Sequence, residues 1–541
     1  MNLFTMLDRL AAQAPDQTAA VDAEGTHLHR VTRAALRDRS LALAADLAER
    51  GVTRGDCIAV WLPNWSSALV WQFAASALGA HVVGVNTRYN TDEVTHILSH
   101  AQPRVIAVAH QFHGLDLIGI LRSAVANVDG WPPQVAVVAG PRAEAPQDTA
   151  SYDVGAGAWC PSAPAHLPPS GRGASERSLD GSELAVAFAT SGSTGMPKLA
   201  AHRGDAVVAH SVATAQALGV TPGDMALCVL PLSGVFGFNT AMTALAGGGG
   251  CLLEPVFDAP AVLDHMAELS VTHVVGGDDL VGKLADSWHQ RPVGLPSWRW
   301  LGIADFLGRS VMLAGWAHTE FGTLTSGVYG SSEVLALTAF WGGDEPSPRR
   351  WRGGGHVHTP GVRARVVDPV SAEPSGTGQE GELQLTGPNV VDAYLGSDTA
   401  AAVFTPDGWF RTGDLCTEES DGSFLYVCRM GDVLRLHGFL VDPAEIETRL
   451  VQHTAVRVAK VVGVRGRTGS NEAVGFVIAD APVTPDEIRQ WCAGALARFK
   501  VPSVIHIVDE LPTTSGTNGT KIRAAALREQ AQLLYDAKEQ A

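Results

Sequence analysis

The sequence predicts an α/β protein in two parts: a large N-terminal domain of layered βα subdomains with a β-rich unit, and a small α/β C-terminal domain. Three observations support this prediction. The 541 residues exceed what one ordinary core accommodates. Helical and short apolar segments alternate along most of the chain, as is typical of parallel sheets. The segment after Asp432 has the size of a small independent domain.

The first 140 residues show the alternation most clearly. An amphipathic run at 31–50 predicts a helix, and the apolar runs at 57–62 and 105–109 predict strands. Residues 67–85 change from a helical to a strand-like pattern at Gly79. This change predicts a buried helix that leads into a core strand, which explains the segment better than a membrane span does.

Later segments complete the prediction. Residues 141–181 are rich in Pro, Gly, Ser and Ala, which predicts a mobile surface connection. Short strand signals with turns from 381 to 427 predict the β-rich unit. Residues 524–540 have the pattern of a polar helix.

Composition excludes several classes of function. The formal net charge is −17, and a chain this acidic is a poor ligand for the phosphates of nucleic acid. The seven cysteines are scattered without a CxxC pair, which argues against a zinc site or a disulfide framework. The N-terminus lacks the basic and apolar regions of a signal peptide. We therefore expect a cytoplasmic protein with buried, unpaired cysteines and no membrane span.

The segment TSGSTGMPK at 190–198 follows the apolar strand-like run 184–189 and has the composition of a phosphate-binding loop. Its glycines allow tight turns that aim N–H groups at an anion, its hydroxyls add donors, and Lys198 adds a positive charge. A Walker loop is excluded because Pro197 precedes the lysine and Leu199 follows it. From composition alone, a solvated Ser/Gly turn remains the alternative.

This loop and later motifs resemble, in order, those of the adenylate-forming superfamily of acyl-CoA synthetases, peptide-synthetase adenylation domains and luciferases. The chain resembles the acyl-CoA synthetase branch, and the likeness covers most of it from about residue 80. The motifs are SGSTGMPK (191–198), LPLSGVFGF (230–238), YGSSE (329–333), GELQLTGP (381–388), GWFRTGDL (408–415), RMGDVLRLHGFLVDPAEIE (429–447) and a terminal TKI (520–522).

The resemblance implies that the chain binds ATP with Mg²⁺ and forms an acyl adenylate. Lys521, Glu333 and Lys198 would be catalytic, with Glu333 as the Mg²⁺ ligand. Asp432 would be the hinge between a large domain, 1–431, and a small mobile domain, 432–541. The residues that would contact the nucleotide are Thr190, Ser191, Gly192, Ser193, Thr194, Gly195, Tyr329, Gly330, Ser332, Asp414 and Arg429.

The substrate pocket departs from the family pattern. Ser233 and Gly234 replace the aromatic residue and histidine that most acyl-CoA synthetases carry. Ile303 stands where a glycine usually leaves the pocket open, and Trp316 and Trp341 are expected to narrow it further. These changes favour a small or aromatic acid over a long fatty chain. The residues expected to line the pocket are Val235, Phe236, Gly302, Ile303 and Ala304.

Three functions are open at this point. The leading hypothesis is a ligase that activates a small or aromatic carboxylic acid with ATP, releases pyrophosphate and transfers the acyl group to coenzyme A. The altered pocket motif motivates a second, a diazotase that activates nitrite with ATP for coupling to an aryl amine. The third, a catalytically silent binding protein, is disfavoured by the retained Lys198, Glu333, Asp414, Arg429 and Lys521.

Overall fold

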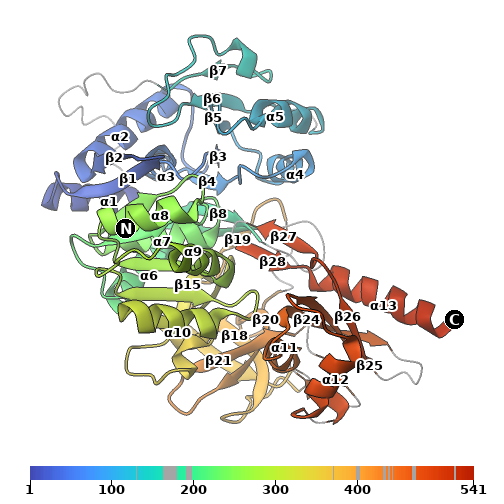
Figure 1. Ribbon diagram of the computed structural model, residues 1–541. Helices are drawn as coiled ribbons and strands as arrows, with labels where there is room; N and C mark the ends of the chain where they lie inside the picture. Colours follow the sequence, from blue (N-terminus) through green and yellow to red (C-terminus); the bar gives the residue numbers. More distant parts are fainter. Residues whose placement is uncertain are drawn as a thin grey trace.

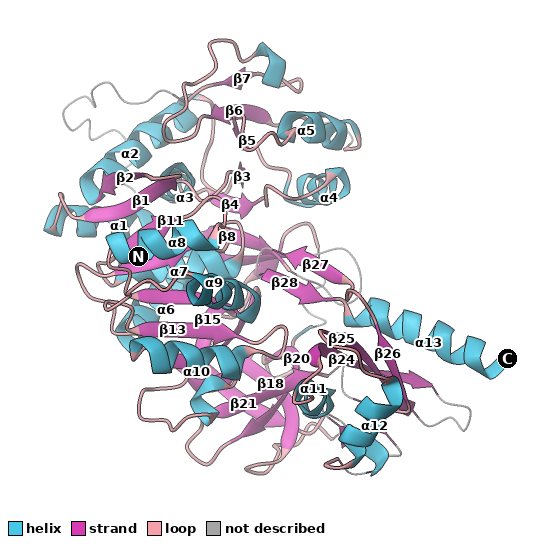
Figure 2. Ribbon diagram, viewed as in Figure 1, coloured by secondary structure: helices cyan, strands magenta, loops and turns pink. Residues whose placement is uncertain are grey.

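The computed structural model describes residues 1–128, 131–161, 180–190, 198–369, 371–397, 403–430, 434–436, 439–441, 443–465, 471–496, 498–516 and 519–540. The large N-terminal part consists of two sheets with helices between them and on both outer faces (Figure 1). Helices and strands alternate through most of this part (Figure 2), so the predicted α/β class is confirmed.

The first sheet is mainly parallel and mostly apolar. Val105 to Ala109 are all buried, as expected for a parallel strand covered on both faces. The order of strands across the sheet is β19 (Ala393–Tyr394), β9 (Leu199–Arg203), β8 (Leu184–Ala189), β4 (His81–Gly84), β3 (Cys57–Trp61), β5 (Val105–Ala109), β6 (Gln134–Val138) and β7 (Ala158–Trp159).

The second sheet joins a parallel half to an antiparallel half. The parallel half contains β14 (Leu324–Ser331), β13 (Trp300–Ala304), β12 (His273–Gly277), β10 (Met225–Cys228), β11 (Gly250–Leu253) and β1 (Thr18–Glu24), with β2 (His27–Thr32) antiparallel at its edge. The antiparallel half continues from β14 through β15 (Leu335–Phe340), β16 (Gly354–Val357), β21 (Phe424–Arg429), β20 (Phe410–Glu418), β18 (Glu380–Thr386) and β17 (Arg363–Val367). The strands from β18 to β21 confirm the predicted β-rich unit.

Helices between the sheets bury their apolar faces on both. α3 (Ser66–Leu78) contacts β4 and β1, and α6 (Gly204–Ala217) contacts β8 and β15. α7 (Val235–Ala246) contacts β10 and β15 of the second sheet, and its Phe238 ring packs on Phe188 of β8 in the first. Gly79 ends α3 with φ 70°, where a residue without a Cβ is favoured, and β4 follows. The other helices of this part are α1 (Leu3–Gln13), α2 (Arg33–Glu49), α4 (Thr91–Ala101), α5 (Leu117–Ala126), α8 (Ala259–Glu268), α9 (Asp278–Gln290) and α10 (Ser310–Phe321).

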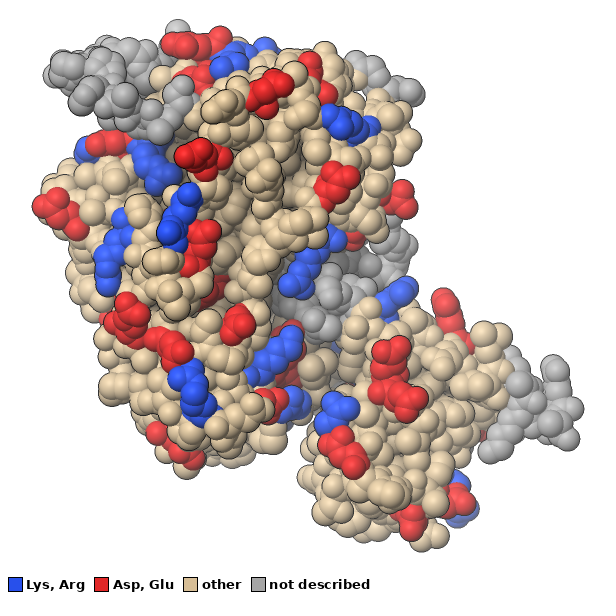
Figure 3. Space-filling view, turned by 45° about the horizontal axis from the view of Figure 1, so that its top comes forward, with Lys and Arg blue, Asp and Glu red and all other residues tan. Residues whose placement is uncertain are grey.

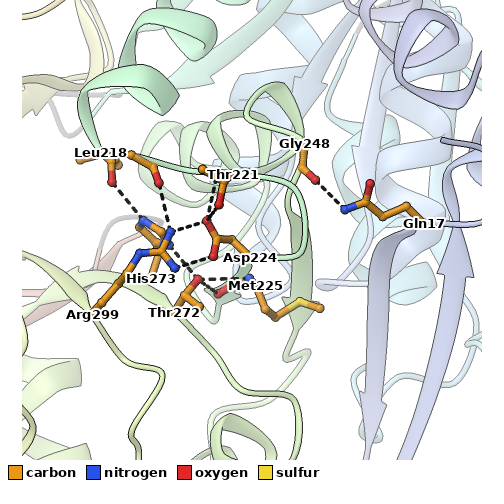
Figure 4. A network of polar contacts seen from close by, with 10 residues as sticks. Gln17, Leu218, Thr221, Asp224, Met225, Gly248, Thr272, His273 and Arg299 are labelled. Carbon is orange, nitrogen blue, oxygen red and sulfur yellow. Dashed lines mark hydrogen bonds and ion pairs between the residues drawn. The ribbon is translucent and has the colours of Figure 1, made fainter. Parts of the chain in front are cut away.

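A polar network ties together the amino ends of β10, β12 and β13 (Figure 4). Arg299 pairs with the buried Asp224 and donates to the Gly219 carbonyl at 3.0 Å. Thr272 Oγ1 lies 2.8 Å from Nδ1 of His273. The network fixes the edge of the sheet opposite to the carboxyl ends of the parallel strands.

Residues after 433 form a separate sheet, as the sequence predicts. Its strands are β22 (Leu434–Leu436), β23 (Phe439–Val441), β24 (Val456–Arg465), β25 (Asn471–Ala479) and β26 (Val504–Ile507), followed by the hairpin β27 (Thr513–Gly516) and β28 (Gly519–Ile522). The helices are α11 (Pro443–Val451), α12 (Pro485–Ala493) and α13 (Ala524–Gln540). The predicted domain boundary at 431/432 lies outside the described residues and stays a prediction.

Part of the predicted 141–181 connection is regular structure. A 3₁₀ turn, Ala150–Tyr152, precedes β7, and β7 pairs in parallel with β6. The prediction missed this strand because it is only two residues long. Residues 162–179 lie outside the described part, and the mobility of the connection stays a prediction.

The structure shows how the cysteines and the charged side chains are placed. None of the seven cysteines forms a disulfide, and all but the half-buried Cys160 are buried. The face of the molecule in Figure 3 carries acidic and basic side chains interspersed, without a broad basic surface. No helix among the described residues is both long and apolar enough to cross a membrane.

Candidate active site

The predicted site residues follow the carboxyl ends of parallel strands. Thr190 follows β8, Ala304 ends β13, and Glu333 lies two residues beyond the end of β14. Ligands of open α/β sheets bind at this edge, because loops and helix N-termini gather there. The amino-end network of Asp224 and Arg299 lies at the opposite edge.

The ends of the phosphate-loop motif are held together by two hydrogen bonds. Thr190 N–H donates to the Lys198 carbonyl at 2.8 Å, and Lys198 N–H donates to Thr190 Oγ1 at 3.2 Å. These bonds extend the antiparallel pairing of β8 and β9. Five predicted contacts lie outside the described residues: Ser191, Gly192, Ser193, Thr194 and Gly195.

Three predicted nucleotide contacts form one polar cluster. The Tyr329 hydroxyl donates to Asp414 Oδ2 at 2.6 Å, and Arg429 Nε lies 3.0 Å from Asp414 Oδ1. Asp414 and Arg429 are paired across β20 and β21, while Tyr329 comes from β14. The fold therefore joins motifs that are 85 residues apart in the sequence.

Protonation in this cluster follows from burial. Burial and, as the next largest cause, the Asp414 carboxylate raise the pKa of the Tyr329 hydroxyl. The phenol therefore keeps its proton and donates it in the hydrogen bond. The Arg429 side chain is about half exposed; its partial burial opposes its charge, but Asp414 and other nearby groups outweigh this effect and raise the pKa of the guanidinium. The cluster presents a carboxylate beside a permanent cation, which suits ribose hydroxyls next to a phosphate.

The YGSSE turn is held from both sides. His202 Nε2 donates to the Ser332 carbonyl at 2.7 Å, and Val391 N–H donates to the Glu333 carbonyl at 2.7 Å. A Cβ on Gly330 would come within 2.6 Å of the Leu335 carbonyl oxygen, so glycine is required there. The Glu333 side chain is partly exposed at this edge.

The strand after the turn is strained. Leu335 and Leu337 have φ of 65° and 62°, a region that leucine rarely occupies. Between them, the Ala336 carbonyl accepts from His210 Nε2 at 2.7 Å and from Asn239 Nδ2 at 2.8 Å. Two helices thus hold a local distortion next to Glu333, which the sequence patterns did not indicate.

The structure brings Tyr394 to the site, and the sequence analysis missed it. Its ring lies under Lys198, with Nζ 5.0 Å from the ring centroid. Burial, with a further contribution from Glu333, raises the pKa of its hydroxyl. The only signal in the sequence is an aromatic residue in the apolar run after GELQLTGP.

The predicted pocket residues do not share one surface. Val235 and Phe236 are buried at the start of α7. His273 and Val275 of β12 line a small cavity with α7, and they pair with Trp300 and Gly302 of β13. Strand alternation therefore turns Gly302 and Ala304 toward α7 and Ile303 toward the opposite face.

This placement puts Ile303 on the face of β13 away from α7, and the narrowing of the pocket by Ile303 stays a prediction. Trp300 covers Gly302, since a Cβ at Gly302 would come within 2.4 Å of the Trp300 ring. Trp316 packs against Trp298 at a ring distance of 5.9 Å, before the amino end of β13. Trp341 bonds the Arg352 carbonyl beyond the far end of β15. These two tryptophans lie away from the carboxyl edge.

The LPLS loop packs tightly against the first sheet. A Cβ on Gly84 would lie 2.5 Å from the Ser233 carbonyl oxygen. Beside this contact a cavity of about 30 Å³ is lined mainly by apolar side chains, with Gln72 and Ser233 as its polar members. That volume accommodates about a water molecule and no organic acid.

The predicted hinge and terminal lysine are only partly described. Asp432 lies outside the described residues. The backbone of Lys521 pairs with Thr514 in the terminal hairpin, and β28 contacts α9. Because α9 begins directly after β12, the hairpin approaches a helix that starts at the carboxyl edge.

Comparison with known proteins agrees with this architecture. A family model described as AMP-binding enzyme matches residues 7–395, and one described as AMP-binding enzyme C-terminal domain matches residues 445–517. In solved structures, ATP-bound MatB from Rhodopseudomonas palustris matches with a TM-score of 0.82 at 24% identity over 99% of this chain and 100% of that chain. An anthranilate CoA ligase, AuaEII, in complex with anthranoyl-AMP matches with a TM-score of 0.81 at 20% identity over 99% and 98%.

Curated relatives align along nearly the whole chain. A 3-[(3aS,4S,7aS)-7a-methyl-1,5-dioxo-octahydro-1H-inden-4-yl]propanoyl:CoA ligase of Rhodococcus jostii is 29% identical over 94% of this chain and 95% of its own length. An indoleacetate–CoA ligase of Aromatoleum aromaticum is 28% identical over 95% and 96%. With the family model covering well over half of the sequence, this chain belongs to the family of AMP-binding enzymes.

Proposed function

We propose that this protein is an ATP-dependent adenylate-forming ligase that activates a small or aromatic carboxylic acid and transfers it to coenzyme A. A carboxylate oxygen attacks the α-phosphorus of ATP, and the bond to the β-phosphate breaks to release pyrophosphate. The thiol sulfur of coenzyme A then attacks the acyl carbon, AMP leaves, and the thiol loses its proton.

The cluster of Tyr329, Asp414 and Arg429 is the observation that carries the proposal. Asp414 is 4% exposed, and its Oδ1 lies 3.0 Å from Arg429 Nε. A buried carboxylate costs free energy unless its pairing or a ligand offsets that cost. Asp414 would accept from the ribose hydroxyls, Arg429 would lie near the phosphates, and Tyr329 would contact the adenine.

Lys198, Glu333 and Lys521 complete the proposed machinery. Glu333 fits Mg²⁺, which is usually held by one or two carboxylates together with substrate phosphates. The described residues contain no group of three or more metal-ligating side chains, and this mode of binding needs none. Bound Mg²⁺ would neutralise phosphate charge, while Lys198 contacts the β- and γ-phosphates through its ammonium group.

Lys521 would bridge the substrate carboxylate and the α-phosphate during adenylation. We propose that residues 432–541 move as a unit about Asp432, which withdraws Lys521 before coenzyme A enters. The approach of β28 to α9 supports an arrangement in which the terminal hairpin reaches the main body.

The choice of acid and acceptor rests on the relatives and on the pocket. The relative named indoleacetate–CoA ligase acts on an aromatic acid by name, and its name includes coenzyme A. The Trp300 ring covers Gly302 and so limits the depth of the acid pocket on the side of α7, which favours short or flat acids. Because the relatives are named for acids, we propose a carboxylate rather than nitrite as the nucleophile.

Pyrophosphate release across a panel of acids, with and without coenzyme A, tests this function. With an aromatic or short acid we expect pyrophosphate release, and when coenzyme A is present we expect AMP equimolar with pyrophosphate and an equal loss of free thiol. A hexadecanoic acid arm checks the size limit, and an arm with nitrite and an aryl amine checks the other nucleophile. Acid-dependent AMP formation without thiol loss would contradict the acceptor, and no pyrophosphate release with any acid would contradict the function.

A further inference from the structure

We infer that Tyr394 is a positioning residue for ATP: its ring holds the Lys198 ammonium group beside Glu333, where the triphosphate is received. This inference rests on the proposed function, because it assigns the partner of a residue at that site. Tyr394 touches the lysine and not the nucleotide, so its role is to orient.

The first argument is the geometry of the lysine. Lys198 Nζ lies 5.0 Å from the centroid of the Tyr394 ring, within the range of a cation–π contact. A lysine side chain has four flexible bonds, and a loose ammonium group loses entropy when a phosphate binds it. A ring under the ammonium group reduces that loss, because the group already occupies a restricted position.

The second argument is the backbone that holds the ring. The segment from Val391 to Leu395 bonds both halves of the site: Val391 N–H donates to the Glu333 carbonyl at 2.7 Å, and Leu395 N–H donates to the Leu199 carbonyl at 3.0 Å. Tyr394 itself pairs with Ala200, two residues beyond Lys198. One short segment therefore sets the spacing of the strand after the phosphate loop and the turn that carries Glu333.

The third argument is the state of the ring. Tyr394 is 4% exposed, and its burial raises the pKa of its hydroxyl. The phenol therefore stays neutral and meets Lys198 through its ring face, not as an anion. A neutral ring orients the ammonium group without competing strongly with the incoming phosphates.

A double-mutant cycle between Tyr394→Leu and Lys198→Met tests the inference, with ATP affinity measured by calorimetry and KM for MgATP measured by pyrophosphate release. We expect Tyr394→Leu to weaken the binding of ATP about three- to thirtyfold and to change KM for the acid less. In the Lys198→Met background the same substitution should add less than about twofold, since the partner is already absent. Tyr394→Phe, which keeps the ring, should restore most of the affinity.

Trp159→Leu is the matched control, because Arg50 lies 4.1 Å from the Trp159 ring in the first sheet, away from the site. It should leave ATP affinity within about twofold of wild type. If Tyr394→Leu does not fold, fluorinated phenylalanines at position 394 weaken the ring quadrupole at nearly constant volume, and ATP affinity should fall with each fluorine.

Additive effects of Tyr394→Leu and Lys198→Met, or affinity unchanged by fluorination, would overturn the inference while wild-type activity stands. A wild-type protein without acid-dependent pyrophosphate release would overturn the proposed function instead.

Discussion

Replacing Asp414 by Asn tests the nucleotide cluster with little change in shape. The carboxylate accepts from Tyr329 at 2.6 Å and lies 3.0 Å from Arg429 Nε. Asn keeps an oxygen that can accept from the phenol but removes the charge. Because the Arg429 side chain is 51% exposed, water compensates part of the lost ion pair. We therefore expect the free energy of unfolding to fall by only about 1 kcal/mol.

The effect on ATP should be larger than the effect on stability. Charge-assisted hydrogen bonds are worth about 1.5–3 kcal/mol each, so losing the proposed acceptor of the ribose hydroxyls should raise KM for ATP roughly ten- to a hundredfold. The contact is present before and during reaction, so kcat should change less than KM. The assay is pyrophosphate release with ATP varied at saturating acid.

Asp421→Asn is the control for this prediction. Asp421 lies in the exposed turn between β20 and β21, where its carboxylate accepts from Ser423. Asn supports the same turn, so KM for ATP should stay within about twofold of wild type. The reasoning is refuted if Asp414→Asn leaves KM for ATP unchanged, or if KM for the acid rises by the same factor as KM for ATP.

Two further predictions concern packing and pH. Gly84→Ala would place a Cβ 2.5 Å from the Ser233 carbonyl oxygen, so we expect the free energy of unfolding measured with urea to fall by about 1–3 kcal/mol and KM for the acid to rise. Gly294→Ala is the control and should be neutral, because no atom lies within 4 Å of the added Cβ. Equal stability of both variants would contradict this packing. Burial lowers the pKa of His210 from 6.5 to about 4, so protonation favours the unfolded chain, and stability should fall by about 3 kcal/mol between pH 6.5 and pH 4 from this group. His210→Gln should flatten that part of the stability–pH curve, and an unchanged slope would contradict the assignment.

Local sequence patterns were sufficient to predict the helices and strands whose buried faces form the core. The run at 105–109 and the change of pattern at Gly79 correspond to β5, α3 and β4 as the structure has them. These elements bury apolar residues at the spacing of their own secondary structure, so no distant partner is needed to recognise them. The motif residues Tyr329, Asp414 and Arg429 also meet in space, because the resemblance carries the fold that joins them.

Long-range pairing explains what the sequence did not indicate. Tyr394 reaches Lys198 only because β19 pairs with β9, which lies almost 200 residues earlier in the chain. The side of the sheet that Ile303 faces depends on the register of β13 against β12 and on the position of α7. Neither the partner strand nor the covering helix is encoded in a local period, so both required the three-dimensional structure.

The most direct test of the account is the first half-reaction of Lys521→Ala, measured as acid-dependent exchange of labelled pyrophosphate into ATP. Lys500→Ala is the matched control, because Lys500 belongs to the same domain and pairs with Glu445 at 2.6 Å. We expect Lys521→Ala to lose on the order of a hundred- to a thousandfold in exchange rate. The same variant should still convert a supplied acyl adenylate and coenzyme A to the thioester. Lys500→Ala should exchange pyrophosphate at the wild-type rate. Exchange by Lys521→Ala at the wild-type rate would contradict the account.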